Sequence, residues 1–152
     1  MARGSTSRYT CPITLQLIGT RSWTEIPAAF SYEVADPFAV RITFGETGAD
    51  ADPAEQGVTW LVGRELLRSG LDRPAGDGDV RVWPVSATAD VLFLHLRAPS
   101  GEALFELSRV ALAAFLRETE LLVPTGSETA TLDLDEELTA LLFNGGADPA
   151  GS

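Results

Sequence analysis

The sequence predicts an α+β fold made of two curved antiparallel sheets, or of one sheet rolled into a partly open barrel. Apolar and polar residues alternate in several short segments, helical spacing occurs once mid-chain and twice toward the C-terminus, and turn residues separate these segments. The expected order is four strands, a short mid-chain helix, three strands and two C-terminal helices. The last helices are expected to cover an open side of the sheets.

The first half of the chain contains the four strands that precede the short helix. In the clearest of them, 38–44, apolar residues occupy every second position, and an Asp36-Pro37 turn joins it to the strand before. The connection 19–27 is expected to be a loop, and the acidic stretch 45–57 an exposed, mobile hairpin tip. The four expected strands are 9–18, 28–35, 38–44 and 58–62.

The centre of the chain, 58–84, combines a strand, a short helix, a tight turn and a second strand. The helix is expected over 64–68, and Gly70 is placed where a left-handed residue would end it. A Gly-Asp-Gly turn at 76–78 leads into the next strand. Pro84 limits that strand to an edge or an end of its sheet, because proline has no N–H for the ladder.

The second half predicts three more strands, at 80–83, 91–97 and 103–107. Both faces of 91–97 are largely apolar, so this strand is expected inside its sheet. Ser108 is expected to cap a helix that ends at Pro124, and Asp133 to cap a last helix that ends at Asn144. The apolar stripe of the first of these helices is predicted to be Leu112, Phe115, Leu116 and Thr119.

The size of the chain suits one ordinary domain, with 152 residues of which 45% are hydrophobic. That domain is expected to span 9–144, with a disordered N-terminus at 1–8 and a disordered tail at 145–152. No stretch approaches the ~18 apolar residues of a membrane span, and the N-terminus lacks the apolar stretch of a secretory signal. A cytoplasmic protein is therefore expected.

The net charge of −11 is concentrated toward the C-terminus. Arginine supplies all 11 positive charges, because the sequence has no lysine, and no arginine lies beyond Arg117. Eight acidic residues follow that position. Such a field repels a phosphate backbone, so general nucleic-acid binding is disfavoured, and a solvated acidic helix and tail better explain the charge.

The titratable residues do not form a pattern that indicates catalysis or metal binding. His95 lies in a strongly apolar strand and is expected to be a satisfied histidine in or near a sheet. Cys11 is expected to be a small buried apolar residue, and one Cys with one His cannot build the usual zinc sets. The acidic run 133–137 fits the start of a helix better than a convergent site. No enzyme, metal site or cofactor is predicted.

Exposed Trp and Arg residues would serve to recognise a partner, because these residue types commonly anchor protein interfaces. Arg81 and Trp83 share one face of the same expected strand, and an interface and the monomer core are equally compatible with that pattern. Trp60 alternates with valines and is more typical of a core residue. The candidate contacts with a partner or within an oligomer are Arg64, Arg73, Arg81 and Trp83.

Four segments, in this order and spacing, match one protein family over nearly the whole chain. They are ADPFAVRITF at 35–44, the central unit 58–84 with its GDVRVWP run, the stretch that ends in LAAFLRET, and LDLDEEL at 132–138. The sequence thereby resembles the SsgA-like family of actinomycete sporulation and cell-division regulators, and its SsgB type most closely.

This resemblance implies a non-enzymatic regulator of sporulation-specific cell division that helps to position septa. It implies recruitment of the tubulin-like division protein FtsZ, or promotion of its polymerisation, together with an SsgA-type paralogue. Family members are expected to form homotrimers, and the family fold is similar to that of whirly-type single-stranded nucleic-acid-binding proteins. The implied location is cytoplasmic, at division septa and close to the membrane without a membrane segment.

The alternative function is that of a whirly-like single-stranded nucleic-acid-binding protein. The similarity of fold and the presence of Trp and Arg on one strand favour this alternative. The net charge of −11 opposes it, as does the lack of a basic groove with several aromatic stacking positions. No nucleic acid is therefore expected as a partner.

Overall fold

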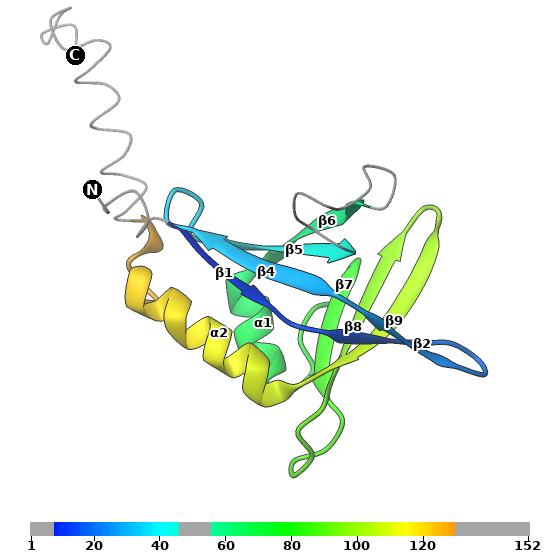
Figure 1. The fold of residues 1–152 in the computed structure, drawn as a ribbon. Helices are drawn as coiled ribbons and strands as arrows, with labels where there is room; N and C mark the ends of the chain where they lie inside the picture. The colour runs from blue at the N-terminus through cyan, green and yellow to red at the C-terminus, as the bar shows by residue number, and fades with distance from the viewer. Residues whose placement is uncertain (1–7, 46–55, 130–152) are drawn as a thin grey trace, which may run out of the picture.

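A computed structural model describes residues 8–45 and 56–129. These residues form an α+β fold with no closed barrel (Figure 1). The helices are α1 (Arg64–Gly70) and α2 (Arg109–Leu122). The strands are β1 (Arg8–Pro12), β2 (Leu15–Ile18), β3 (Trp23–Ile26), β4 (Ala28–Glu33), β5 (Ala39–Gly45), β6 (Gln56–Gly63), β7 (Val80–Pro84), β8 (Leu92–Ala98) and β9 (Gly101–Leu107).

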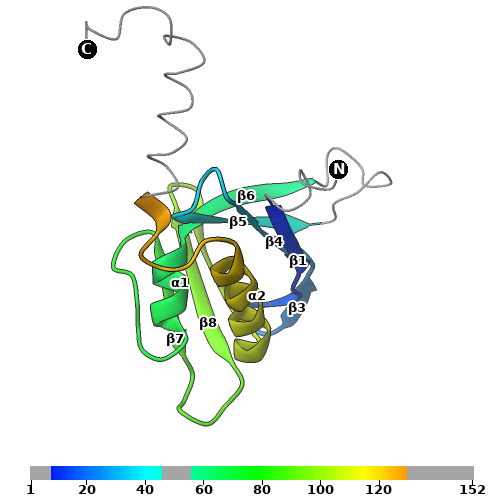
Figure 2. The ribbon, with the colours of Figure 1, turned by 90° about the vertical axis from the view of Figure 1, so that its left-hand side faces the viewer.

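The strands form two antiparallel sheets, which was one of the two predicted arrangements. The first sheet has the order β1-β4-β5-β6 and the second the order β3-β2-β9-β8-β7. Helices α1 and α2 lie side by side on one side of the molecule, and α1 packs against β7 (Figure 2). As predicted, β8 lies inside its sheet, and β7 ends in Pro84 at a sheet edge.

The first expected strand, 9–18, is two strands in the structure, and they belong to different sheets. β1 pairs with β4, whereas β2 pairs with β3 and β9. Between them the Ile13 N–H donates to Ala28 O at 2.9 Å, and the Ile13 side chain enters the core. The prediction of one strand was wrong because Pro12 has no N–H to donate to a neighbouring strand. The alternation of apolar residues contains no information about this missing hydrogen bond.

The connection 19–27 was expected to be a loop, but it contains β3. The Gly19 N–H donates to Ser22 O at 2.8 Å and closes a tight turn between β2 and β3. β3 is an edge strand whose side chains are mostly exposed. It therefore lacks the alternation that reveals a half-buried strand.

The core lies between the inner faces of the two sheets and α2. Phe30 of β4 and Ile42 of β5 pair across the first sheet and are fully buried. Tyr32 is also fully buried, and its hydroxyl donates to Pro37 O at 2.9 Å, so its polar atom has a partner. The second sheet and α2 supply the opposite wall, with Leu15, Val82, Leu92, Leu94, Leu96, Phe105, Leu107, Leu112, Phe115 and Leu116.

Gly70 has a different role from the predicted one. It was expected to end the helix in a left-handed conformation, but it lies within α1, and the C-cap Leu71 has a right-handed φ of −65°. A Cβ at Gly70 would lie 2.5 Å from Val82 Cγ1, so the missing side chain is what lets α1 approach β7. The left-handed glycine of this region is Gly76, with φ +90° in the turn before β7.

Ser108 caps α2, as predicted. The Ala111 N–H donates to Ser108 Oγ at 3.0 Å. Asp90 supports the same helix start, because its carboxylate accepts bonds from the Ser108 hydroxyl at 3.0 Å and from the Val110 N–H at 2.7 Å. The predicted stripe of Leu112, Phe115, Leu116 and Thr119 is buried.

Some sequence predictions concern residues outside the described part of the chain, which lacks 1–7, 46–55 and 130–152. They are the disordered ends of the 9–144 domain, most of the mobile hairpin tip 45–57 and the last helix after Asp133. Gly45 and Gln56, at the two ends of that tip, belong to β5 and β6. Arg8, which was assigned to the disordered N-terminus, is the first residue of β1.

Gly70→Ala should lower the free energy of unfolding by about 1–3 kcal/mol, despite the higher helix propensity of alanine, because the new Cβ would overlap Val82. Urea denaturation followed by circular dichroism measures the change. Gly78→Ala is the control, since a Cβ at Gly78 would meet no atom within 4 Å. Equal stability of the two variants would contradict the role assigned to Gly70.

Candidate functional site

Arg64 is a buried charge that joins α1, α2 and the first sheet. The residue is 2% exposed. Its guanidinium donates to Thr119 O at 3.1 Å and to Val123 O at 2.8 Å, and it pairs with Glu128 at 2.6 Å. Its Cζ lies 5.0 Å from the centre of the Tyr32 ring. The structure thus corrects the prediction that Arg64 contacts a partner, because the chain itself surrounds this side chain.

The surroundings of Arg64 are complementary to its charge. The carbonyl end of a helix favours positive charge, and Arg64 supplies it at the end of α2. There it donates to Val123 O and adds a second donor to Thr119 O, which also accepts from the Val123 N–H at 2.9 Å. The hydrogen bond from Arg64 holds the pKa of Glu128 below its ordinary value. Burial raises the pKa of Tyr32 to about 12, so Arg64 lies over a neutral ring at pH 7.

Arg81 and Trp83 lie on the outward side of the second sheet, because Val82 between them points into the core. The register of β7 and β8 places Arg81 beside His95 and Trp83 beside Phe93. Further along the sheet, His95 pairs with Leu104 and Ile18 pairs with Trp23. We call this side of the sheet the outer face, and define it by Ile18, Trp23, Arg81, Trp83, Phe93, His95 and Leu104.

Large apolar side chains of the outer face do not pack against the core. Trp23 is 62% exposed. Trp83 and Phe93 are half-buried because they cover each other, with ring centroids 5.5 Å apart. Leu104 is likewise half-buried, yet none of these three belongs to the side chains packed on the core. Apolar groups gathered on a surface and bordered by polar ones are typical of an interaction site.

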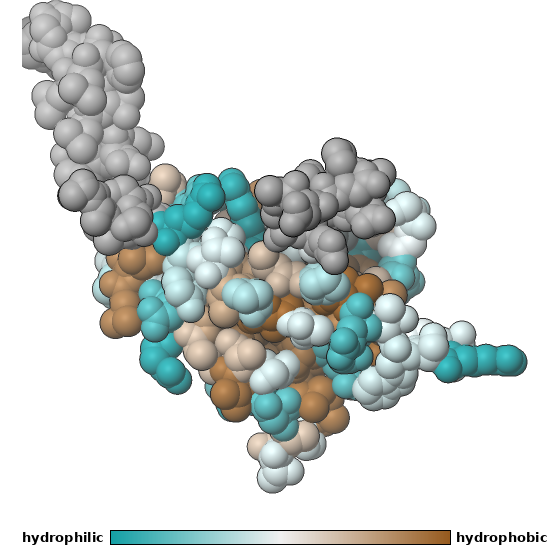
Figure 3. Space-filling model, in the orientation of Figure 1, coloured by the Kyte–Doolittle hydropathy of each residue, from teal (hydrophilic) through white to brown (hydrophobic). Residues whose placement is uncertain are grey.

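The outer face has charges of both signs. His95 Nε2 lies 2.7 Å from Glu102 Oε1, so His95 is the satisfied histidine that the sequence predicted. Arg81 is exposed, and Glu106 pairs in register with Phe93. On the side of the molecule that Figure 3 displays, hydrophobic and hydrophilic residues also lie next to one another. Aromatic residues and arginine among mixed charges are typical of protein interfaces, whereas a phosphate backbone requires an excess of positive charge.

Arg73 does not belong to the outer face. It is exposed in the loop after α1, where its N–H donates to Ser69 O at 3.1 Å. Of the four predicted contact residues, the structure therefore brings together Arg81 and Trp83. Sequence reasoning missed Trp23, which was assigned to a loop, and did not single out Phe93. The alternation of apolar residues on both faces of 91–97 was the signal that could have found Phe93.

Within 8–45 and 56–129, no three His, Cys, Asp or Glu side chains are grouped to hold a metal ion. The helices described there are too short or too polar to cross a membrane. Cys11 is half-buried against the core, with its thiol 3.6 Å from Pro12 O.

The sequence is similar to known sporulation proteins. A family model described as Streptomyces sporulation and cell division protein, SsgA, matches residues 26–128. The sporulation-specific cell division protein SsgB of Frankia casuarinae is 46% identical over 121 residues, which cover 79% of this chain and 80% of that protein. SsgB of Streptomyces coelicolor is 43% identical over 134 residues, which cover 87% and 93%.

Solved structures agree with the sequence comparison. An SsgA-like sporulation-specific cell division protein from Thermobifida fusca superposes with a TM-score of 0.74 at 36% identity, and covers 87% of this chain and 93% of that one. A structure from work on SsgB mutations that correlate with longitudinal cell division in Streptomyces coelicolor has a TM-score of 0.70 at 40% identity, with coverage of 82% and 94%. The similarity thus extends over most of each chain.

Arg64→Met should lower the free energy of unfolding by at least about 2 kcal/mol, because Thr119 and Val123 lose a donor and Glu128 loses its ion pair. Urea denaturation measures the loss. Arg68→Met is the matched control, since it removes only an exposed pair with Glu65 and should cost less than about 1 kcal/mol. Unchanged stability of Arg64→Met with weakened partner binding would restore Arg64 as a contact residue.

Proposed function

Because this chain belongs to the SsgA family of sporulation and cell division proteins, we propose that it is a non-enzymatic regulator that helps to position septa during sporulation. The predicted family resemblance is confirmed, and the names of the relatives support a role in sporulation-specific cell division. The family is one of cell division regulators and is not a known enzyme family. The observation on which the proposal rests is 43% identity to Streptomyces coelicolor SsgB over 87% of this chain.

The molecular step that we propose is recruitment of FtsZ to future septum sites, or promotion of its polymerisation, together with an SsgA-type paralogue. The protein acts in the cytoplasm, beside the septal membrane. The proposed contact surface is the outer face. Arg81, Trp83 and the exposed Trp23 are residue types that commonly anchor protein interfaces.

The architecture suits an adaptor that works through a preformed surface. The outer face lies on a five-stranded sheet, in which the inner strands β2, β9 and β8 are paired on both sides and the edge strands β3 and β7 are each paired with one neighbouring strand. The mutual packing of Trp83 and Phe93 restricts the rotamers of both rings. A partner therefore meets ordered side chains, and binding costs less conformational entropy than it would on a flexible loop.

Single-stranded nucleic-acid binding is not proposed, because the comparisons give it no support. The carboxylates of Glu25, Glu102 and Glu106 belong to the strands that form the outer face, where they would repel phosphates. The similarity to whirly-type proteins remains a prediction from the family resemblance.

The double variant Arg81→Glu/Trp83→Ala should raise the Kd for FtsZ at least about tenfold in co-sedimentation with FtsZ polymers, because it removes two anchors of the outer face. Circular dichroism confirms that the variant is folded. Arg117→Glu is the matched control, an exposed arginine on α2 away from the outer face, and should bind normally. Unchanged binding of the double variant would exclude the outer face as the contact surface. A wild-type protein that neither binds FtsZ nor changes its polymerisation would exclude the FtsZ step itself.

A homotrimer is the oligomeric state that we propose from the family resemblance. Multi-angle light scattering of the full chain should then give about three times the 16.2 kDa chain mass. The mass should stay constant on dilution through the micromolar range. A mass of one chain at every concentration would contradict the trimer and leave the septal role to be tested separately.

A further inference from the structure

The outer edge of the first sheet is a free strand edge without the usual protection. Among the described strands, β6 pairs with β5 alone. Free edges offer unpaired N–H and C=O groups, and proteins usually protect them with charge, proline or short length. The other three sheet edges have such protection: β1 has Arg8 and Pro12, β3 has four residues including Glu25, and β7 has Arg81 and Pro84. β6, QGVTWLVG, is eight residues long and contains no charged residue or proline.

The apolar side chains of β6 are exposed on both sides of the sheet. Val58 is 66% exposed on the inner side, where Val62 of the same strand is buried. Leu61 is 59% exposed on the opposite side. Exposed apolar side chains beside unpaired backbone groups favour the addition of another strand.

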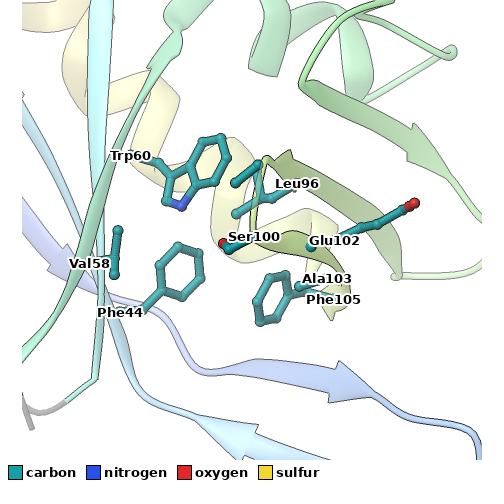
Figure 4. A pocket seen from close by; sticks show the side chains of 10 residues that line it. Phe44, Val58, Trp60, Leu96, Ser100, Glu102, Ala103 and Phe105 are labelled. Carbon is teal, nitrogen blue, oxygen red and sulfur yellow. The ribbon is translucent and has the colours of Figure 1, made fainter.

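An apolar pocket of about 380 Å³ opens beside β6, where the two sheets meet. Phe44 of the first sheet stacks on Phe105 of the second, with ring centroids 5.0 Å apart. In Figure 4 the Trp60 and Val58 side chains lie on the first-sheet side of this pocket, and Ala103 lies beside Phe105 on the other. The volume falls within the range of about 300–1,000 Å³ that is usual for ligand pockets. One large apolar side chain is the ligand that such a lining suits.

We propose that the edge of β6 and this pocket, together called the β6 groove, bind an extended segment of another protein by strand addition. The segment has apolar residues at alternate positions, one of which enters the pocket, and it has a net positive charge. Hydrogen bonds between the two backbones supply affinity, and the pocket selects the side chain. This inference does not rest on the proposed septal function or on FtsZ.

Geometry favours such a segment over a second copy of this chain, and charge favours a basic one. The net charge of −11 attracts a basic segment, and no positively charged residue is among those that line the pocket. In a dimer in which β6 paired with β6 of a second copy, the inner side chains Val58 and Trp60 of each copy would line the pocket of their own chain. They would therefore not be available to fill the pocket of the other copy.

The first experiment selects peptides from a phage-displayed random library on the full wild-type chain and measures them by fluorescence anisotropy. Selected peptides should alternate apolar residues and contain Lys or Arg. Val58→Lys, which places a charge at the free edge, should raise their Kd at least about tenfold. Val110→Lys is the matched control, because Val110 is 64% exposed and belongs to α2, not to the free edge or to the lining of the pocket. Failure to select any peptide that distinguishes Val58→Lys from wild type overturns the proposal.

The second experiment tests the binding mode with the best selected peptide. N-methylation of alternate residues on the edge facing β6 should abolish binding, whereas N-methylation of the other edge should leave it unchanged. Raising the salt concentration should weaken binding of a basic peptide, because salt screens its attraction to the net charge of −11. Equal effects of the two methylation patterns exclude strand addition. If Val58→Lys instead lowers the oligomer mass in light scattering, the groove is occupied by a second copy and the proposal fails.

Discussion

The buried guanidinium of Arg64 is the interaction on which the placement of both helices depends. Arg64 is the first residue of α1. Its guanidinium donates to carbonyl groups at the end of α2 and lies over the ring of Tyr32 in the first sheet. A buried arginine is stable only when its donors and its charge are compensated, and here helix carbonyls and Glu128 do so together. Because Arg64 links three elements, the helices are held on one side of the molecule and leave the outward sides of the sheets open.

The two open surfaces differ in the way they could meet a partner. The outer face offers side chains, with the aromatic pair of Trp83 and Phe93 and the exposed Arg81 on the edge strand β7 and its neighbour β8. The β6 groove offers backbone groups along an uncharged edge and one apolar pocket. The outer face therefore suits side-chain contacts, whereas the β6 groove suits the addition of a strand.

Local patterns predicted the elements whose signals are local. The alternation in β5, the Ser108 cap of α2 and the edge position of β7 before Pro84 all follow from neighbouring residues and agree with the structure. The division of 9–18 between two sheets could not be predicted in the same way, because each half satisfies the alternation by itself. β3 was missed for the opposite reason, since an exposed edge strand has no buried face to impose a pattern.

The sequence by itself therefore determined the strand-rich α+β class, the helix start at Ser108 and the family, because each of these depends on residue order alone. Only the tertiary structure decided the roles of Arg64 and Gly70. A buried arginine and an exposed one look alike in a sequence, and the difference lies in carbonyls more than fifty residues away. Gly70 is likewise explained by Val82 on a neighbouring strand, a distance between chain segments that no local pattern contains.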